Sequence, residues 1–274
     1  MSEYKIFIKQ YFNKKWKSAS EQHVRAFLSH LYHDNHLAPT TIKTYVTAIS
    51  YHYKIKKLTN ITEGFAIEQQ LKNFMKHHKS SLVRHPITKE ILDSLLQYTL
   101  DFYPDNYFKN MFYVIYNWMF KMALRISEIT NHSKNYNHAI SLYDVSLNHK
   151  NHTVNVTLRS FKHSKGDPIT YKIQNSPTLW KATKAYKALR GPSPGSFFLQ
   201  PDGKHISKLF FTKNLKNALN ALGFNEKHFN SHSFRIGRAS SLAENGASQS
   251  EISIIGRWNS EAYRKYIKPT SIHI

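Results

Sequence analysis

Two segments of the chain place an arginine three residues from a second side chain that can act near a phosphate group. Arg125 and Glu128 stand at the end of an otherwise apolar segment, where a guanidinium needs a partner. His232 and Arg235 follow residues that can cap a helix, and at this spacing both side chains can meet one anion near its N-terminus. Each segment also has a purely structural explanation. The first can be an Arg–Glu pair that closes a helix, and the second can be a capped helix with an incidental histidine.

Two further segments supply lysines and tyrosines. The segment 159–165 joins two alternating runs, and its Lys162 and Lys165 can track a nucleic-acid groove or hold an ammonium group over a reacting phosphate. The segment 255–267 carries Tyr263 and Tyr266 about one helical turn apart. Solvated turn lysines and tyrosines packed into a core are the alternatives here.

Metal-dependent chemistry has weaker support. His30, His33 and His36 step by three, but without cysteine or carboxylate partners beyond Asp34 a frayed helix end explains them better. A metal-dependent transposase would need paired carboxylates, and no two of the candidates share a convincing strand context: Asp101, Asp105, Asp144, Asp167 and Asp202. The glycines form no Gly-x-x-x-x-Gly-Lys pattern. We therefore expect no metal and no cofactor.

The elements that must position these side chains are mainly helices. Through the first 80 residues the apolar positions recur at helical spacing. Ser18 and Glu21 predict a capping box for one helix, and Pro39 starts the next. Pro86 disfavours helix at the residue before it, which indicates a linker, and a new helix begins at Thr88 to Glu90.

The remaining chain combines helices with a hairpin. A helix is predicted over 107–130, followed by two alternating runs at 153–158 and 169–173 that predict a β-hairpin. Helical patterns resume at about Thr178. Asn230 or Ser231 can cap the helix of His232, Ser248 caps one that ends near Gly256, and Ser260 can cap the last.

The composition indicates a polyanionic partner. The 274 residues carry a formal net charge of +22, while 41% apolar and 14% aromatic residues exclude a flexible histone-like tail. Without cysteine there is no disulfide framework, zinc–thiolate site or catalytic thiol. The start of the chain lacks a signal-peptide pattern, and the apolar segment 111–124 is too short to span a bilayer, so we expect an intracellular protein without a membrane partner.

Taken together, the four segments resemble the catalytic set of the tyrosine recombinase (phage integrase-like) family, in the same order along the chain. The segments 161–164, 232–237 and 256–263 look most like those of eukaryotic DIRS-like and Crypton mobile elements, which would imply a nuclear location. One departure is that only eight residues follow Tyr266, so a C-terminal extension of the kind many members pass to a neighbour is short or absent.

This resemblance implies a metal-free phosphoryl transfer through a 3′-phosphotyrosyl link. Arg125 and Arg235 would clamp the scissile phosphate, and Tyr266 would attack phosphorus. His232 would accept the tyrosine proton, and Lys162, or alternatively Lys165, would protonate the leaving 5′-oxygen. Trp258 would bond a phosphate oxygen and support the Tyr266 helix, while Glu128 would orient Arg125; these roles complete the expected site.

The resemblance also implies two domains, a helical core-binding domain at 1–85 and a catalytic domain at 86–274, and hence a mainly helical fold with a small β-sheet. The expected partner is double-stranded DNA, bound by a homo-oligomer, usually a tetramer on synapsed sites. Residues expected to contact DNA outside the catalytic set have cationic or hydroxyl side chains: Lys43, Thr44, Thr47, Arg159 and Lys165.

Two alternatives share either the catalytic set or the fold. A type IB topoisomerase uses a similar set to relax DNA, and the Trp258 position with its Gly-Arg-Trp context favours a recombinase over it. A domesticated DNA-binding protein would keep the fold without cutting, although every predicted catalytic position holds a competent residue.

Overall fold

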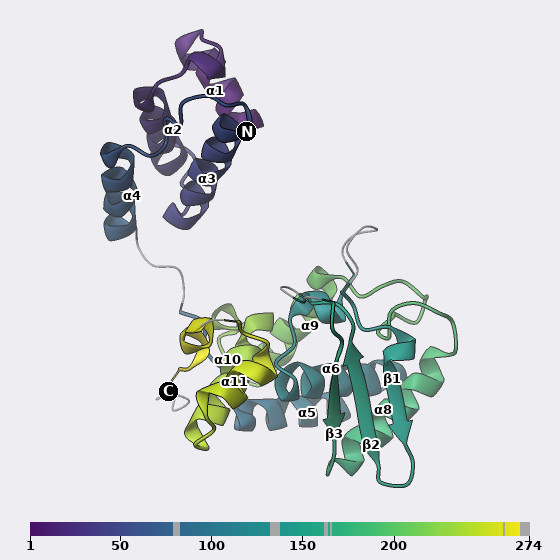
Figure 1. The fold of residues 1–274 in the computed structure, drawn as a ribbon. Coiled ribbons are helices and arrows are strands. Elements are labelled where there is room, and N and C mark those ends of the chain that lie inside the picture. Colours follow the sequence, from purple (N-terminus) through teal and green to yellow (C-terminus); the bar gives the residue numbers. More distant parts are fainter. Residues whose placement is uncertain (79–82, 132–137, 162–163, 165, 260, 269–274) are drawn as a thin grey trace. The chain divides into compact units, whose positions relative to one another are not determined.

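The computed structural model describes residues 1–78, 83–131, 138–161, 164, 166–259 and 261–268. The chain divides into two compact units, Met1–Ser81 and Leu82–Ile274, each with its own hydrophobic core. The fold is mainly helical with one small antiparallel sheet, as predicted (Figure 1). Among the described helices, none has the length and apolar character needed to cross a membrane.

The first unit packs its helices around aromatic and aliphatic side chains. Its elements are α1 (Ser2–Phe12), the 3-10 turn η1 (Trp16–Ser18), α2 (Glu21–His33), α3 (Pro39–Ile55) and α4 (Phe65–His77). Helix α3 begins at Pro39 as predicted, but the predicted Ser18–Glu21 capping box is wrong. Ser18 lies in η1, and Ser20 caps α2 instead, with its backbone N–H donating to His23 Nδ1 at 3.0 Å.

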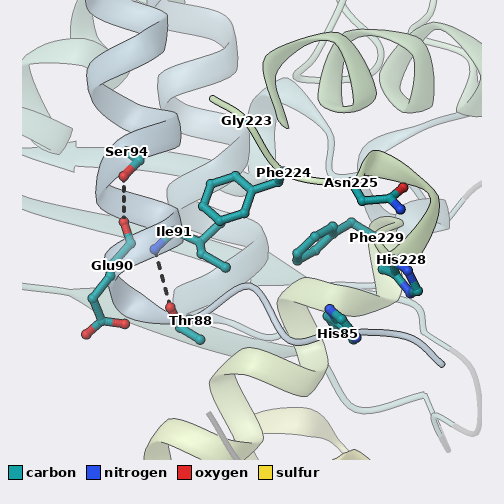
Figure 2. Close-up of a pocket in the computed structure, with 10 residues that line it drawn as sticks. All are labelled: His85, Thr88, Glu90, Ile91, Ser94, Gly223, Phe224, Asn225, His228 and Phe229. Atoms are coloured by element: carbon teal, nitrogen blue, oxygen red, sulfur yellow. Dashed lines mark hydrogen bonds between the residues drawn. The ribbon is translucent and has the colours of Figure 1, made fainter. Parts of the chain in front are cut away.

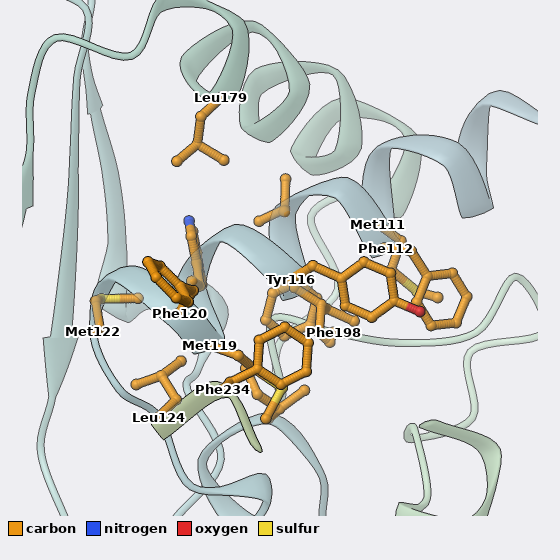
Figure 3. Packing of buried hydrophobic residues seen from close by; sticks show 14 of the residues in the cluster. Met111, Phe112, Tyr116, Met119, Phe120, Met122, Leu124, Leu179, Phe198 and Phe234 are labelled. Carbon is orange, nitrogen blue, oxygen red and sulfur yellow. The ribbon is translucent and has the colours of Figure 1, made fainter. Parts of the chain in front are cut away.

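The second unit is built on a buried central helix, α6 (Asn106–Lys121), whose apolar residues face other elements on nearly every side (Figure 3). It packs against α5 (Lys89–Phe102), α8 (Pro177–Arg190) and α10 (Ser231–Glu244). Thr88 caps α5 as predicted, since its hydroxyl accepts the Ile91 N–H at 3.3 Å. The helical part of this unit also includes α9 (Lys208–Ala221) and the 3-10 turn η3 (Glu226–His228).

The predicted helix over 107–130 is wrong beyond Lys121. Ala123 takes a left-handed conformation, with φ of 45°, and the N–H groups of Ala123 and Leu124 donate back to Phe120 and Met119 at 3.2 and 3.1 Å. This hydrogen-bond pattern is a Schellman motif, which ends a helix. The chain then forms the short helix α7 (Ile126–Ile129), so Arg125 precedes a helix rather than lying inside one.

Three antiparallel strands flank this helical body. The predicted hairpin strands appear as β2 (Thr153–Leu158) and β3 (Ile169–Ile173), and a strand that the sequence did not predict, β1 (Val145–Asn148), follows the 3-10 turn η2 (Leu142–Asp144). The register pairs Val156 with Tyr171 across β2 and β3. The β3 residue Tyr171 also lies close to the end of helix α11 (Gln249–Gly256), because its hydroxyl donates to the Ile255 carbonyl at 2.9 Å.

The chain closes with α11 (Gln249–Gly256) and η4 (Glu261–Tyr266). Ser248 caps α11 as predicted, its hydroxyl accepting the Glu251 N–H at 3.3 Å. The last element is a 3-10 helix rather than the α-helix expected, and its predicted cap, Ser260, lies outside the described residues.

Candidate active site

Helix α10 presents two of the predicted site residues in its first turn. Asn230 caps the helix because its side-chain oxygen accepts the His232 N–H at 2.8 Å. In return, the Ser233 hydroxyl accepts the Asn230 N–H at 3.1 Å. This cap fixes where the helix begins, and the i, i+3 spacing then sets His232 and Arg235 on one side of it. His232 keeps part of its side chain accessible to solvent, whereas Arg235 is only 1% exposed.

The Arg235 guanidinium is held by two carbonyl groups. Nη1 donates to Ala123, the left-handed residue after α6, and Nη2 donates to Gly256 at 3.0 Å. Burial, together with the charges of Arg125 and Arg257, lowers the pKa of Arg235 to about 10. The group therefore stays charged at neutral pH, and the two carbonyls fix its orientation.

Arg125 and Glu128 form a pair around the start of α7. The Glu128 carboxylate is buried and accepts the Arg125 backbone N–H at 2.8 Å, while Arg125 Nη1 lies 3.4 Å from Glu128 Oε1. The Arg125 side chain is 17% exposed. Among the described residues, the guanidinium makes one long side-chain contact, with this carboxylate, so its other donors can serve an anion.

Tyr266 and Trp258 form an aromatic wall beside Arg235. Their rings lie 4.9 Å apart, and the Arg235 guanidinium carbon lies 4.7 Å from the Trp258 ring and 5.4 Å from the Tyr266 ring. Backbone contacts hold the segment in place, because Ser240 Oγ donates to the Tyr266 carbonyl at 3.2 Å and accepts the Lys268 N–H at 2.8 Å. The phenol is consequently placed next to a cation.

The other tyrosine of this segment has a different environment. Tyr263 is 5% exposed and packs with Ala239 and Ile252 in a small core, whereas Tyr266 is partly exposed. A group that must reach a phosphate on a large substrate needs access to solvent. Of the two, Tyr266 alone has that access together with the arginine neighbour.

The electrostatic surroundings keep His232 neutral. Partial burial lowers its pKa below the usual 6.5, and the nearby charges of Arg235, Lys208 and Arg125 lower it further. A neutral imidazole has a free nitrogen lone pair and can accept a proton at pH 7.

One buried residue of the site was not predicted from the sequence. Arg257 donates from Nη2 to Glu128 Oε2 at 2.7 Å, so the same carboxylate links Arg125 to a second arginine. The sequence carried only an indirect signal, since Arg257 stands in the Gly-Arg-Trp segment next to Trp258. A buried Glu128 requires a cationic partner, but nothing in the spacing says that the partner is 129 residues away.

The predicted residues of the second unit thus fall into three groups. Arg125 contacts Glu128, and Arg235 contacts both Trp258 and Tyr266. The charges of Arg125 and Glu128 act on Arg235, and those of Arg235 and Arg125 act on His232, so the two sets lie within electrostatic reach of each other and of the histidine. Lys162 and Lys165 lie outside the described residues. Arg159 donates at 2.5 Å to the carboxylate of Asp144, a buried residue outside the predicted catalytic set.

The candidate DNA-contact residues of the first unit share one exposed side of α3. Lys43, Thr44 and Thr47 are all exposed, opposite the buried Ile42 and Ile49. Each threonine hydroxyl donates to a carbonyl of its own helix, Thr44 at 3.2 Å and Thr47 at 3.0 Å. Their second lone pairs and the lysine remain available to another molecule.

Neither the histidines of the first unit nor the pocket beside α5 in the second unit belongs to the cluster of predicted catalytic residues. Within the described ranges no three histidine, aspartate or glutamate side chains converge as metal ligands, and His30 instead pairs with Asp34 at 2.6 Å. A pocket of about 500 Å³ lies between α5 and η3, where the His85 and His228 rings stack 4.5 Å apart (Figure 2). It contains none of the predicted catalytic residues.

Comparison with known proteins identifies the family. The model of the phage integrase family matches residues 85–271, and the chain belongs to this family. No curated protein sequence matches.

Solved structures share the fold across both units at low sequence identity. The XerH site-specific recombinase bound to palindromic difH substrate is 12% identical, with a TM-score of 0.66 over 97% of this chain and 72% of that one. The Tn1549 transposon integrase in complex with transposon right-end DNA is 14% identical, with a TM-score of 0.63 over 93% and 82%. A λ integrase dimer bound to a COC′ core site is 12% identical, with a TM-score of 0.59 over 97% of this chain and 71% of that one.

Proposed function

We propose that this protein is a DNA recombinase or integrase that cuts and rejoins double-stranded DNA through a 3′-phosphotyrosyl intermediate. The observation that carries the proposal is the placement of Tyr266 against Arg235 and Trp258, with Arg125 in the same charge cluster. A phenol beside fixed guanidinium groups is suited to attack a phosphate, because the cations stabilise the negative charge that develops in the transition state.

The proposed reaction proceeds in two matched steps. Tyr266 Oη attacks phosphorus as His232 takes its proton, the bond from phosphorus to the 5′-oxygen breaks, and Lys162, or alternatively Lys165, gives that oxygen a proton. A 5′-hydroxyl from the same or another strand then attacks the phosphotyrosyl link and gives its proton back to the lysine, while the bond from phosphorus to Tyr266 Oη breaks and His232 returns the proton to that oxygen. The link keeps the energy of the phosphodiester, so rejoining needs no nucleotide cofactor.

The wider assignments follow from the same proposal. Residues 1–85 would serve as a helical core-binding domain and residues 86–274 as the catalytic domain, with a homo-oligomer, usually a tetramer, assembling on synapsed sites. The DNA-bound recombinases of the same fold support a duplex partner. The segments 161–164, 232–237 and 256–263 support an origin in a DIRS-like or Crypton-like element, and thus a nuclear location.

Covalent trapping tests the proposal at its centre. The full chain is incubated in EDTA with a pool of nicked duplexes of randomised sequence, in which the cut releases a short strand and prevents rejoining. We expect a protease-sensitive protein–DNA adduct that Tyr266→Phe abolishes and that the matched control Tyr263→Phe retains. An adduct that survives Tyr266→Phe, or one that requires magnesium, would contradict the mechanism.

The products separate the remaining alternatives. Joined strands from two different duplexes indicate recombination, whereas plasmid relaxation without joined products indicates a topoisomerase. Binding of duplex DNA without any adduct indicates a DNA-binding protein that has lost cutting.

A further inference from the structure

Arg257 occupies a backbone position that usually belongs to glycine. Its N–H donates to Ile254 O at 3.2 Å and the next N–H donates to Ser253 O at 3.0 Å, which is the Schellman pattern at the end of α11. In this motif the residue at Arg257 is left-handed, and here φ is 55°. A side chain held in that region is stabilised by its surroundings, and such positions concentrate at functional sites.

The surroundings of Arg257 explain why the conformation persists. The guanidinium is 1% exposed and donates from Nη1 to Met122 O at 3.2 Å and to the Tyr171 hydroxyl. Nη2 donates to Glu128 Oε2 at 2.7 Å. One side chain therefore ties together the ends of α6 and α11, strand β3 and helix α7.

The carboxylate of Glu128 is divided unequally between two arginines. Oε2 accepts the short bond from Arg257 and the Arg125 backbone N–H at 2.8 Å, while the Arg125 guanidinium reaches only Oε1, at 3.4 Å. Short, buried, charge-assisted hydrogen bonds are the strong ones. The negative charge of Glu128 is thus taken up mainly by Arg257 and by a backbone group.

We propose that Arg257 is a positioning residue that neutralises Glu128 and so leaves the Arg125 guanidinium free to bind the scissile phosphate. The inference rests on the proposed function and deepens it. Without Arg257, the buried carboxylate has Arg125 as its remaining cationic partner among the contacts described, and a buried charge cannot stay unpaired at low cost. Arg125 would then close on Glu128 and leave the phosphate.

A carbonyl of the same cluster adds a second effect on positioning. The Ala123 carbonyl accepts from Arg235 Nη1 and lies 3.5 Å from Arg257 Nη2. Arg257 therefore also supports the group that orients Arg235, the second proposed clamp on the phosphate.

The test combines Arg257→Met with Glu128→Gln. We expect Arg257→Met to slow adduct formation at saturating nicked DNA by about 100-fold, the loss typical of one transition-state donor, with DNA affinity unchanged within about threefold. Adding Glu128→Gln removes the charge that captures Arg125, so the double variant should recover at least about tenfold over Arg257→Met. A merely structural arginine would show no such recovery.

Arg190→Met is the matched control. Arg190 is also buried, at 8% exposure, and donates to the carbonyls of Gly191 and Ser196 in a loop that contains no predicted site residue. Its loss should lower the melting temperature without slowing the reaction of the folded protein, and Glu128→Gln should bring no gain on that background. A wild-type rate for Arg257→Met, or a double variant no faster than Arg257→Met, would overturn the proposal.

A thermodynamic cycle keeps the inference separate from the proposed function. The unfolding equilibria of the two single variants and the double variant, measured in denaturant, should be non-additive by at least about tenfold because the two groups share a buried contact. A wild-type protein that forms no adduct contradicts the proposed function. Additive unfolding effects contradict the pairing of Arg257 with Glu128, whatever the activity.

Discussion

His232 is the residue whose protonation should set how the reaction depends on pH. Its folded-state pKa lies below 6.5 because of partial burial and three nearby cations, so the neutral form that accepts a proton predominates at pH 7. We expect the adduct rate to hold steady from pH 8 down to about 6.5 and to fall below that as the imidazole is protonated. His232→Gln should lower the rate about 100-fold to 10,000-fold and remove this acid limb. Single-turnover adduct formation against pH measures both.

Lowering the pH should reduce the stability of the fold as well as the rate of the reaction. Because the pKa of His232 is depressed on folding, the unfolded chain binds the proton first, and the free energy of unfolding falls as pH drops below about 6.5. His205→Gln is the control, since His205 is exposed and outside the cluster. An acid limb that persists in His232→Gln would assign the proton acceptor to another group.

At the scale of elements, the end of α11 depends on a glycine for its packing. A Cβ built on Gly256 would lie 1.8 Å from Cζ3 of Trp258, the ring that packs against Tyr266. We expect Gly256→Ala to displace the indole, slow adduct formation by at least about tenfold, and cost about 1–3 kcal/mol of unfolding free energy, as overpacking typically does. Adduct rates are compared well below the melting temperature of each variant.

Gly237→Ala provides a contrast within the same unit. A Cβ there would lie 1.7 Å from the Ile87 carbonyl and would strain the contact between α10 and the segment before α5. This variant should also be destabilised, yet Trp258 stays in place and the adduct rate of the folded protein should be kept. Equal slowing in both variants would show that lost stability, rather than the Trp258 position, controls the rate.

The helices and strands also show which boundaries can be predicted from the sequence and which cannot. The strands at 153–158 and 169–173 were predicted with their observed bounds because their alternation is a local signal. Strand β1 was missed because its four residues are too short to show a period. The helix predicted to reach 130 stops at Lys121 through a left-handed Ala123, and alanine is the strongest helix former, so only tertiary contacts such as that from Arg235 could reveal the break.

The candidate site likewise contains residues that the sequence predicted and one that it did not. Residue types and order indicated Arg125, Glu128, His232, Arg235, Trp258 and Tyr266, and the structure places these close together. Arg257 was missed as a member because its role is defined by Glu128 and Tyr171, which the fold brings near from distant parts of the chain. Partners of a buried charge are a property of packing rather than of spacing.

For the whole molecule, the proposed function divides the net charge of +22 between chemistry and binding. Each lysine that neutralises a phosphate of B-DNA contributes about 0.9 to the slope of log affinity against log salt. Lys43 is exposed on α3, and we expect Lys43→Gln to weaken DNA binding and to reduce that slope by about 0.9, with the adduct rate at saturating DNA unchanged. Fluorescence anisotropy over a salt series measures the slope.

The controls decide whether charge acts by location or only by number. Lys204 has the same charge as Lys43, but it is paired with Asp202 at 2.6 Å, so Lys204→Gln should leave the slope unchanged. Arg125→Ala removes one charge as well, yet it should stop adduct formation while DNA stays bound, because its cation is assigned to the reacting phosphate. If all three variants weakened binding alike and none altered the rate selectively, the positive charge would serve attraction alone, and the proposed division between residues that bind the duplex and residues that bind the reacting phosphate would be wrong.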